Sequence, residues 1–272
     1  MNQLDNFKEY LKREEKSTAT TEKYLRDCRA FLIFAEDQPV TKNLTAAYKQ
    51  SLIARGLRPS SVNSMLAALN CYLRFMQLEE LQVKPLRIQR KTYCTESSQL
   101  TRSEYEKLLC ASESKPRLHL AMQTICSTGI RVSELRWFTI EAVRTGEITL
   151  QNKGKTRTIL IPGKLRKKLL NYAAMQGMTS GVIFRTKSGK PLDRSNLWRA
   201  MKQICKNTGI AAEKVFPHNL RKLFARMFYK AEKDIAKLAD ILGHGSIETT
   251  RIYIMTTSRE HLQKIERLGL VV

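Results

Sequence analysis

Apolar side chains recur every three or four residues along residues 1–82, which is the spacing of amphipathic helices. Gly56 and Pro59 stand between two of the predicted helices, where a glycine ends one helix and a proline suits the start of the next. The pattern predicts a compact all-α domain of four or five helices. Its helices are predicted over residues 2–16, from Thr18 or Thr20 to Asp37, over 41–55 and from the Arg58–Ser61 turn to Gln77.

Residues 83–100 lack this periodicity and are rich in basic and small polar side chains. Such a composition is typical of a linker between domains. Helical spacing then returns, with a long helix over 116–128 that ends at Gly129 and a short helix over 131–138. Further helices are predicted over 164–176, 193–208, 217–231, 233–241, 246–253 and 258–268.

One stretch of the second half departs from helical spacing. Between residues 147 and 161 the apolar positions alternate as in strands, and Asn152–Lys155 has the composition of a hairpin turn. The fold predicted for the chain is mainly α with a small antiparallel β-sheet, and Trp137 and Trp198 are expected to lie in its core. We expect an all-α N-terminal domain over 1–82, a basic interdomain linker over 83–100 and a mixed α/β domain over 101–272.

The sequence lacks the features of several protein classes. It has no run of about 18 apolar residues, so no transmembrane helix is predicted, and its acidic N-terminus does not resemble a secretory signal. The six cysteines are scattered without a CxxC pair, which argues against a zinc site and against a disulfide framework. Reduced thiols fit a cytoplasmic protein.

The charge balance points to a polyanionic partner. The chain has 48 Lys and Arg against 25 Asp and Glu, a net charge of +23 at pH 7, spread over its whole length. Nucleic acid is the natural complement of such a surface, and a solvated basic surface is the alternative. The basic linker then has two interpretations, an extended arm that follows phosphates or a plain solvated loop.

Three short stretches carry side chains that suit phosphate chemistry. The first reads TGIRVSEL from residue 128 and places Arg131 just after a helix end, with Glu134 three residues on. An arginine here can face an anion while the glutamate holds its guanidinium group. Taken alone, the pair also fits an ordinary surface ion pair.

The second stretch, Pro217–Arg221, has His218 and Arg221 three residues apart. On a helix this spacing places both side chains on one face. There the guanidinium can bind two phosphate oxygens and the imidazole can exchange a proton near neutral pH. A lone His-x-x-Arg pair is weak evidence for such a site.

The third stretch has His244 directly after a helix-ending glycine, and Tyr253 nine residues further on. Tyrosine is a poor nucleophile because its free pKa is about 10. Cations that converge on a phosphate would favour both its deprotonation and its attack. Most tyrosines are structural, so the case for Tyr253 depends on the other two stretches.

Together these stretches resemble the sequence boxes of the tyrosine recombinases, also called the phage integrase family. TGIRVSEL resembles the first arginine box, HNLR the His-x-x-Arg box, and LGH followed by TTRIY the last box, which ends in the nucleophile. Their order and separation also agree, and the short, two-domain, Xer-like members are the most similar. The resemblance implies a SAM-like core-binding domain over 1–82 and a catalytic domain over 101–272.

The resemblance implies an enzyme that cleaves and rejoins DNA through a 3′-phosphotyrosyl intermediate. Arg131 and Arg221 would bind the non-bridging oxygens of the scissile phosphate and stabilise the transition state. Tyr253 would attack phosphorus, and His218 would assist the proton transfer. His244 would hydrogen-bond a phosphate oxygen.

The family also uses a lysine in the β-hairpin as the acid for the leaving 5′-oxygen. Lys153 matches that position best, but the hairpin is one residue tighter than usual, which leaves Lys155 as a substitute. Lys222 stands where many relatives carry histidine. Glu134 would support the site as a positioning residue rather than carry a proton.

The resemblance also implies partners. They are double-stranded DNA with a specific recombination site and further copies of the chain, four protomers on two duplexes joined in a Holliday junction. No metal and no ATP are implied, and the sequence offers no grouping of metal ligands. The tail is expected to contact a neighbouring protomer of this homotetramer or, alternatively, to fold back on its own domain; its apolar face consists of Leu262, Ile265, Leu268 and Leu270.

Two other functions remain open at this point. A type IB topoisomerase uses a similar set of residues but relaxes supercoils alone, and the core-binding-like N-terminal domain favours recombination over it. A non-catalytic DNA-binding regulator would bind without a covalent intermediate, and the complete catalytic set argues against it. The sequence does not identify the target site, the biological role or any accessory DNA-bending or regulatory protein.

Overall fold

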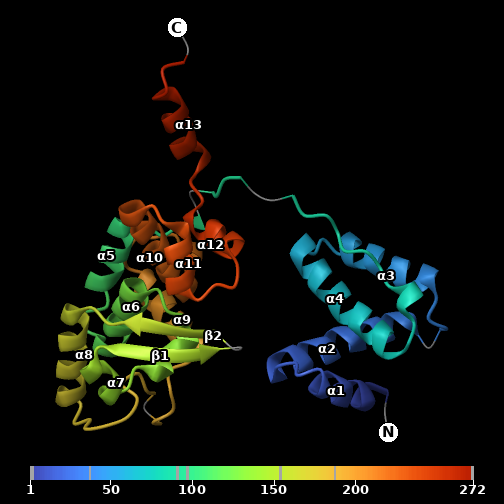
Figure 1. Ribbon diagram of the computed structural model, residues 1–272, viewed down its shortest axis with the longest axis horizontal. Coiled ribbons are helices and arrows are strands. Elements are labelled where there is room, and N and C mark those ends of the chain that lie inside the picture. The colour runs from blue at the N-terminus through green and yellow to red at the C-terminus, as the bar shows by residue number, and fades with distance from the viewer. Residues whose placement is uncertain are drawn as a thin grey trace. The chain divides into compact units, whose positions relative to one another are not determined.

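The structure is a computed structural model, and it describes residues 3–36, 38–89, 92–95, 98–152, 155–186 and 188–270. The chain divides into two compact units, Met1–Arg90 and Lys91–Val272 (Figure 1). No helix among the described residues is both long and apolar enough to cross a membrane.

The described part of the first unit is helical. Ser17 and Thr41 cap the second and third helices by accepting hydrogen bonds from backbone N–H groups, and Pro59 occupies the first position of the fourth. Its elements are α1 (Gln3–Arg13), α2 (Thr18–Ala35), α3 (Lys42–Ala54), α4 (Pro59–Phe75) and the 3₁₀ turn η1 (Glu79–Leu81).

Helices α2 and α4 pack against each other and join two apolar clusters. One cluster attaches α1 through Phe7 and Leu11, and the other attaches α3 through Tyr48 and Leu52, all of them buried. Burying a large apolar side chain contributes about 1.5–3 kcal/mol. The two clusters therefore hold the four helices together.

The segment after η1 is attached to this unit, although residues 83–100 were expected to act as a linker throughout. Asn70 on α4 exchanges two hydrogen bonds with the backbone of Val83, at 2.9 and 3.0 Å. Asn63, two turns earlier, does the same with Leu86, at 2.9 and 2.7 Å. Val83 is also buried in the apolar core. The two asparagine side chains bond the backbone N–H and C=O groups of this segment, as a neighbouring strand would do. The hydrophobic pattern of residues 83–100 could not predict this attachment, because the asparagines lie on another element.

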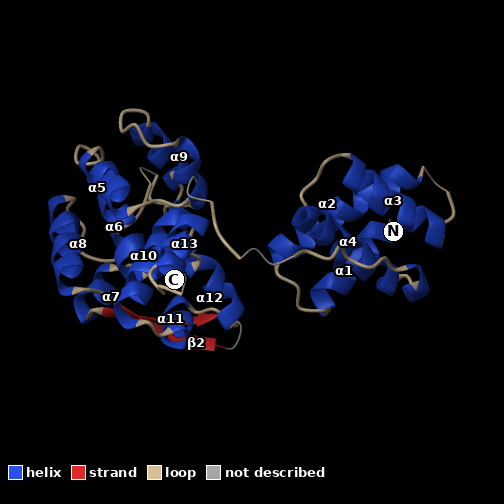
Figure 2. Cartoon of the chain, turned by 90° about the horizontal axis from the view of Figure 1, so that it is seen from above, coloured by secondary structure: helices blue, strands red, loops and turns tan. Residues whose placement is uncertain are grey.

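The second unit is also mainly helical and contains, in its described residues, one two-stranded sheet (Figure 2). Its elements are α5 (Arg102–Cys110), α6 (Pro116–Thr128), η3 (Val132–Trp137), α7 (Ile140–Thr145), β1 (Glu147–Asn152), β2 (Lys155–Leu160), α8 (Gly163–Met175), α9 (Arg194–Cys205), η4 (Ala212–Lys214), α10 (Pro217–Glu232), α11 (Ile235–Leu242), α12 (Ile247–Ile254) and α13 (Ser258–Glu266).

The sheet confirms the predicted fold class. β1 and β2 pair antiparallel, with Ile148 opposite Ile159 and Leu150 opposite Arg157. The apolar members of these pairs face the core and are buried, because alternate residues of a strand lie on one face. The chain is thus mainly α with a small antiparallel sheet.

Helix α6 runs through the main core of the second unit and ends at Gly129, which has a positive φ of 65°. α10 packs directly against α6. A Cβ atom at Gly129 would lie 2.4 Å from Cδ1 of Phe224 on α10. Glycine is needed here both for the left-handed backbone and for this close approach, which brings the TGIR motif against the HNLR helix.

The short helix predicted after Arg131 is present as the 3₁₀ helix η3. One local expectation was wrong. Trp137 and Trp198 do not lie in the core, since they are 47% and 45% exposed. Each instead contacts a neighbouring cation, with Arg136 Cζ 5.0 Å from the ring centroid of Trp137 and Lys202 Nζ 5.6 Å from that of Trp198. Such cation–π contacts stabilise an aromatic ring at the surface.

Candidate active site

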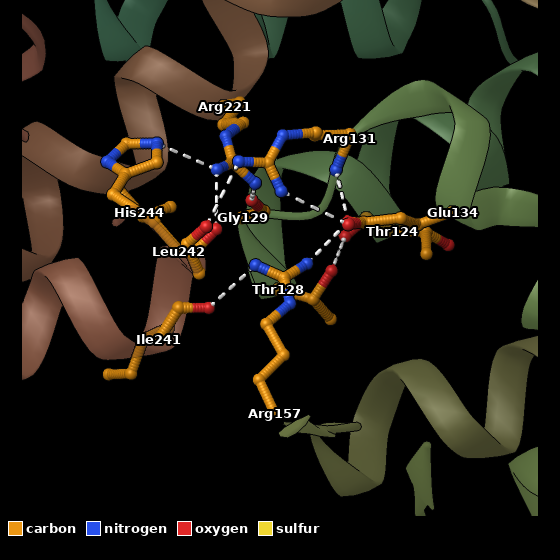
Figure 3. A network of polar contacts seen from close by, with 11 residues as sticks. Thr124, Thr128, Gly129, Arg131, Glu134, Arg157, Arg221, Ile241, Leu242 and His244 are labelled. Atoms are coloured by element: carbon orange, nitrogen blue, oxygen red, sulfur yellow. Dashed lines mark hydrogen bonds and ion pairs between the residues drawn. The ribbon is translucent and has the colours of Figure 1, made fainter. Parts of the chain in front are cut away.

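Segments far apart in the sequence bring their polar side chains together on the second unit. Figure 3 shows the guanidinium groups of Arg131, Arg157 and Arg221 close to one another, with His244 to one side. Arg131 precedes η3, Arg157 lies on β2 and Arg221 on α10, while His244 follows the end of α11.

Arg221 is the deepest of these residues, with 1% of its surface exposed. It donates to the carbonyl oxygens of Gly129 and, at 2.7 Å, Leu242. Burial, followed by the charge of Arg131, lowers its pKa to about 10. Two helix-end carbonyls thus fix a guanidinium that remains positively charged at pH 7.

Glu134 joins the other two arginines. One of its oxygens accepts from the Arg131 backbone N–H at 2.7 Å and from the Arg157 side chain, while the other accepts from Arg131 Nη1 at 3.3 Å. Glu134 is 7% exposed. A buried carboxylate between two guanidinium groups fixes the direction of both, which agrees with the supporting role expected for it.

Sequence reasoning did not single out Arg157. Its guanidinium also donates to the carbonyl of Ile241 at 3.1 Å, and burial lowers its pKa. A Cβ atom at Gly243 would lie 2.7 Å from Arg157 Cδ, so the glycine of the LGH motif leaves room for this side chain. One signal in the sequence could have identified Arg157, which lies on the inner face of a predicted strand. The alternation of apolar residues, however, does not predict which segment covers that face.

His244 has a defined hydrogen-bonding state. Its Nε2 lies 2.9 Å from Arg221 Nη2, and its Nδ1 lies 2.9 Å from Thr250 Oγ1. A guanidinium has no acceptor, so Nε2 must accept and the proton of the ring resides on Nδ1. Burial and the charges of Arg221 and Arg131 lower the pKa of His244 to about 4. The ring is therefore neutral at pH 7.

Tyr253 lies on α12 between the two histidines. Its ring centroid is 4.8 Å from that of His244 and 5.1 Å from that of His218, and the guanidinium carbon of Arg221 lies 5.9 Å from it. His218 is exposed at the surface, but desolvation and the charges of Lys222 and Arg221 lower its pKa to about 4. A neutral imidazole can take up a proton from a neighbouring phenol.

Of the two candidate lysines, Lys153 lies outside the described residues. Lys155 begins β2 and pairs with Asn152 of β1. The predicted set is thus brought together in five members, Arg131, His218, Arg221, His244 and Tyr253, with Glu134 supporting them.

The arrangement suits a bound anion. Three guanidinium groups converge, with Glu134 as the carboxylate that pairs with two of them. The buried Nε of Arg221 has no hydrogen-bond partner among the described residues. Converging arginines match the geometry of phosphate oxygens. The described residues contain no group of three or more His, Cys, Asp or Glu side chains that could hold a metal ion.

Comparison with known proteins agrees with this geometry. The sequence model of the phage integrase family matches residues 98–260, and that of the phage integrase N-terminal SAM-like domain matches residues 4–80. Tyrosine recombinase XerA of Pyrococcus furiosus is 32% identical over 276 residues, which cover 98% of this chain and 94% of that protein.

Two solved structures share the fold. A lambda integrase tetramer bound to a Holliday junction has a TM-score of 0.72 at 23% identity, covering 92% of this chain and 76% of that one. A post-cleavage complex of XerH recombinase with a palindromic difH substrate has a TM-score of 0.71 at 19% identity, covering 91% and 77%. The relaxing enzyme and the non-catalytic regulator are not favoured by these matches. The chain therefore belongs to the phage integrase family, the tyrosine recombinases.

Proposed function

We propose that this chain is a site-specific DNA recombinase that works through a 3′-phosphotyrosyl intermediate, with Tyr253 as its nucleophile. The observation that carries the proposal is the placement of the Tyr253 ring against two neutral imidazoles and a buried guanidinium group. The match of residues 4–80 to an integrase N-terminal domain supports recombination over simple relaxation.

In the proposed cleavage step, Arg131 and Arg221 bind the two non-bridging oxygens of the scissile phosphate. The Tyr253 oxygen attacks phosphorus, and its proton passes to His218, whose pKa of about 4 keeps the ring unprotonated beforehand. Charge that builds on the phosphate in the transition state meets guanidinium groups already held in position, which avoids reorganisation during the reaction.

In the same step the bond from phosphorus to the 5′-oxygen breaks, and that oxygen needs a proton. We assign this proton to Lys153 or Lys155, the lysines of the β1–β2 hairpin. The phosphotyrosyl ester conserves the energy of the phosphodiester, so attack by the 5′-hydroxyl of a second duplex can rejoin the strands and release Tyr253.

Strand exchange between two duplexes requires four protomers, and the likeness to a lambda integrase tetramer bound to a Holliday junction supports this assembly. Within α13, which is described in full, no residue is buried. Its apolar side chains Leu262 and Ile265 are 55% and 50% exposed. We assign this face to a neighbouring protomer, and a chain that ends at Arg259 should still bind DNA but fail to form tetramers on it.

The helical first unit and the net charge of +23 support a protein that holds duplex DNA, and we assign it to the cytoplasm. Basic side chains that replace counterions make such binding strongly dependent on salt. The affinity for duplex DNA should therefore fall steeply between low and physiological salt. Accessory DNA-bending or regulatory proteins, if the reaction needs them, would appear as a requirement for cell extract in a purified assay.

The experiment that tests the proposal uses nicked suicide duplexes cut from the DNA that flanks the gene of this protein. Cleavage releases a short fragment, so that the covalent intermediate accumulates and appears on a denaturing gel. We expect a DNA-linked protein band with the wild-type chain and none with Tyr253→Phe. A band that persists with Tyr253→Phe would overturn the assignment of the nucleophile.

A further inference from the structure

The chain segment that enters the second unit contacts the residues just after α12, the helix that carries the proposed nucleophile. We call residues 92–95 and 98–100 the strap. Cys94 N–H donates to the carbonyl of Thr256 at 3.1 Å, and Cys94 forms a parallel bridge with Thr257. The strap is the green segment at the base of α13 in Figure 1. It therefore contacts the residues that connect α12 to α13.

Gln99 makes the principal side-chain contact of the strap with this connection. Its Nε2 donates to the carbonyl of Met255 at 3.0 Å and also to the Cys94 sulfur. The Cys94 thiol donates to the same carbonyl at 3.2 Å. Met255 is the C-cap residue of α12 and lies two residues after Tyr253. One carbonyl beside the nucleophile is thus held by two side chains of the strap.

The other side of the strap is attached to α10, which carries His218 and Arg221. Asn219 is 1% exposed, and its Nδ2 donates to the carbonyl of Ser98 at 3.0 Å. The Arg226 side chain donates to the carbonyl of Leu100, whose own side chain is fully buried. The strap therefore joins the catalytic helix α10 to the end of α12.

This connection matters because α12 is short. A helix of eight residues is marginal by itself, and its placement depends on tertiary contacts. Near its middle, the buried Thr250 contacts His244. At its end the strap supplies the contact to Met255. Loss of the second contact would let the last turn, which carries Tyr253, move relative to His218 and Arg221.

We propose that Gln99 is a positioning residue, which holds Tyr253 in line for attack by fixing the Met255 carbonyl to the strap. The proposal rests on the assignment of Tyr253 as the nucleophile.

The test compares Gln99→Met with Ser98→Ala. The first keeps the length of the side chain but removes its N–H donors. The second removes a hydroxyl that donates to the Thr95 carbonyl, within the strap. We measure DNA affinity, the thermal midpoint, and the single-turnover rate of the covalent band. We expect Gln99→Met to slow that rate about tenfold at unchanged DNA affinity, a size that loss of a hydrogen bond to the part-buried Met255 carbonyl accounts for, and Ser98→Ala to behave as wild type.

A suicide duplex with a bridging sulfur at the scissile 5′ position separates this role from proton donation. Sulfur leaves without a proton, so a defect in the general acid disappears on this substrate. The Gln99→Met defect should persist at the same size, because the attacking group is misplaced. A wild-type rate for Gln99→Met, or its recovery on the sulfur substrate, would overturn the proposal.

A second substitution keeps the proposal testable if Gln99→Met does not fold. Gln99→Glu keeps the length and polarity of the side chain, but its carboxylate has no N–H donor for the Met255 carbonyl. We expect the same loss of rate at unchanged DNA affinity, and a wild-type rate for Gln99→Glu would contradict the proposal. A wild-type chain that forms no Tyr253-dependent band refutes the proposed function instead, so the two failures are distinct.

Discussion

Replacing Glu134 with glutamine should separate the orientation of the arginines from their charge. Glu134 is 7% exposed and accepts three hydrogen bonds, from the Arg131 backbone, the Arg131 side chain and the Arg157 side chain. Glutamine keeps one acceptor oxygen but turns an N–H₂ donor toward the Arg131 guanidinium, which itself only donates. The contact at 3.3 Å is lost and the two guanidinium groups repel each other without the carboxylate between them.

The magnitude follows from these contacts. A hydrogen bond to a charged group contributes about 1.5–3 kcal/mol, so Glu134→Gln should lower the free energy of unfolding by about that amount, or roughly 10- to 150-fold in the unfolding equilibrium. The single-turnover rate of the covalent band should fall at least about tenfold because Arg131 loses its orientation. DNA affinity should not fall, since removal of a negative charge makes the pocket more positive.

Urea unfolding and the suicide-duplex assay together check this prediction. Glu106→Gln is the matched control, because Glu106 pairs with Arg102 at the surface with 57% of its side chain exposed, and such pairs contribute at most about 1 kcal/mol. If Glu134→Gln unfolds at the same urea concentration as Glu106→Gln and cleaves as fast, the account of the arginine network is wrong.

Three further predictions concern the same pocket. Arg221→Lys should abolish the covalent band while duplex binding persists, because one ammonium group cannot reach both the Gly129 and Leu242 carbonyls; gel shifts beside the suicide assay check this. Gly129→Ala should lower the thermal midpoint, because its Cβ would meet Phe224 at 2.4 Å where φ is positive; an unchanged midpoint in calorimetry would contradict the argument. The free energy of unfolding should decline as pH falls from about 6.5 toward 4. The pKa of His244 is about 4 in the folded chain and about 6.5 in the unfolded chain, so the unfolded chain binds the extra proton in this range. Urea titrations of the wild type and His244→Gln check this, because the variant should lose part of the pH dependence.

The periodicity of apolar residues predicted most of the fold, and the order of the motifs identified the segments that form the candidate site. The helices, the hairpin and the two glycine-ended motifs could be predicted because each depends on local spacing and on backbone conformation. The attachment of Val83 and Leu86 to α4 could not, since two asparagines on another element supply it. Arg157 was missed for the same reason, because its partners Glu134 and Ile241 are distant in the sequence.

The predicted site shows the same division between local and distant information. Sequence motifs named the residues that meet the phosphate in the proposed reaction, but, apart from Glu134, not the ones that hold them. Gln99, which holds Met255, lies outside the three motifs, and Thr250, which contacts His244 Nδ1, lies within the last motif but was given no role. Their contribution depends on contacts that only the folded chain defines.

The central claim is tested most directly by identifying the amino acid that is joined to DNA. The covalent complex formed on a suicide duplex is digested with trypsin and nuclease, and the nucleotide-bearing peptide is sequenced by mass spectrometry. The account predicts a single adduct, on Tyr253 in the peptide that follows Arg251, with the nucleotide attached through its 3′-phosphate. An adduct on any other residue, or one attached through a 5′-phosphate, would contradict it.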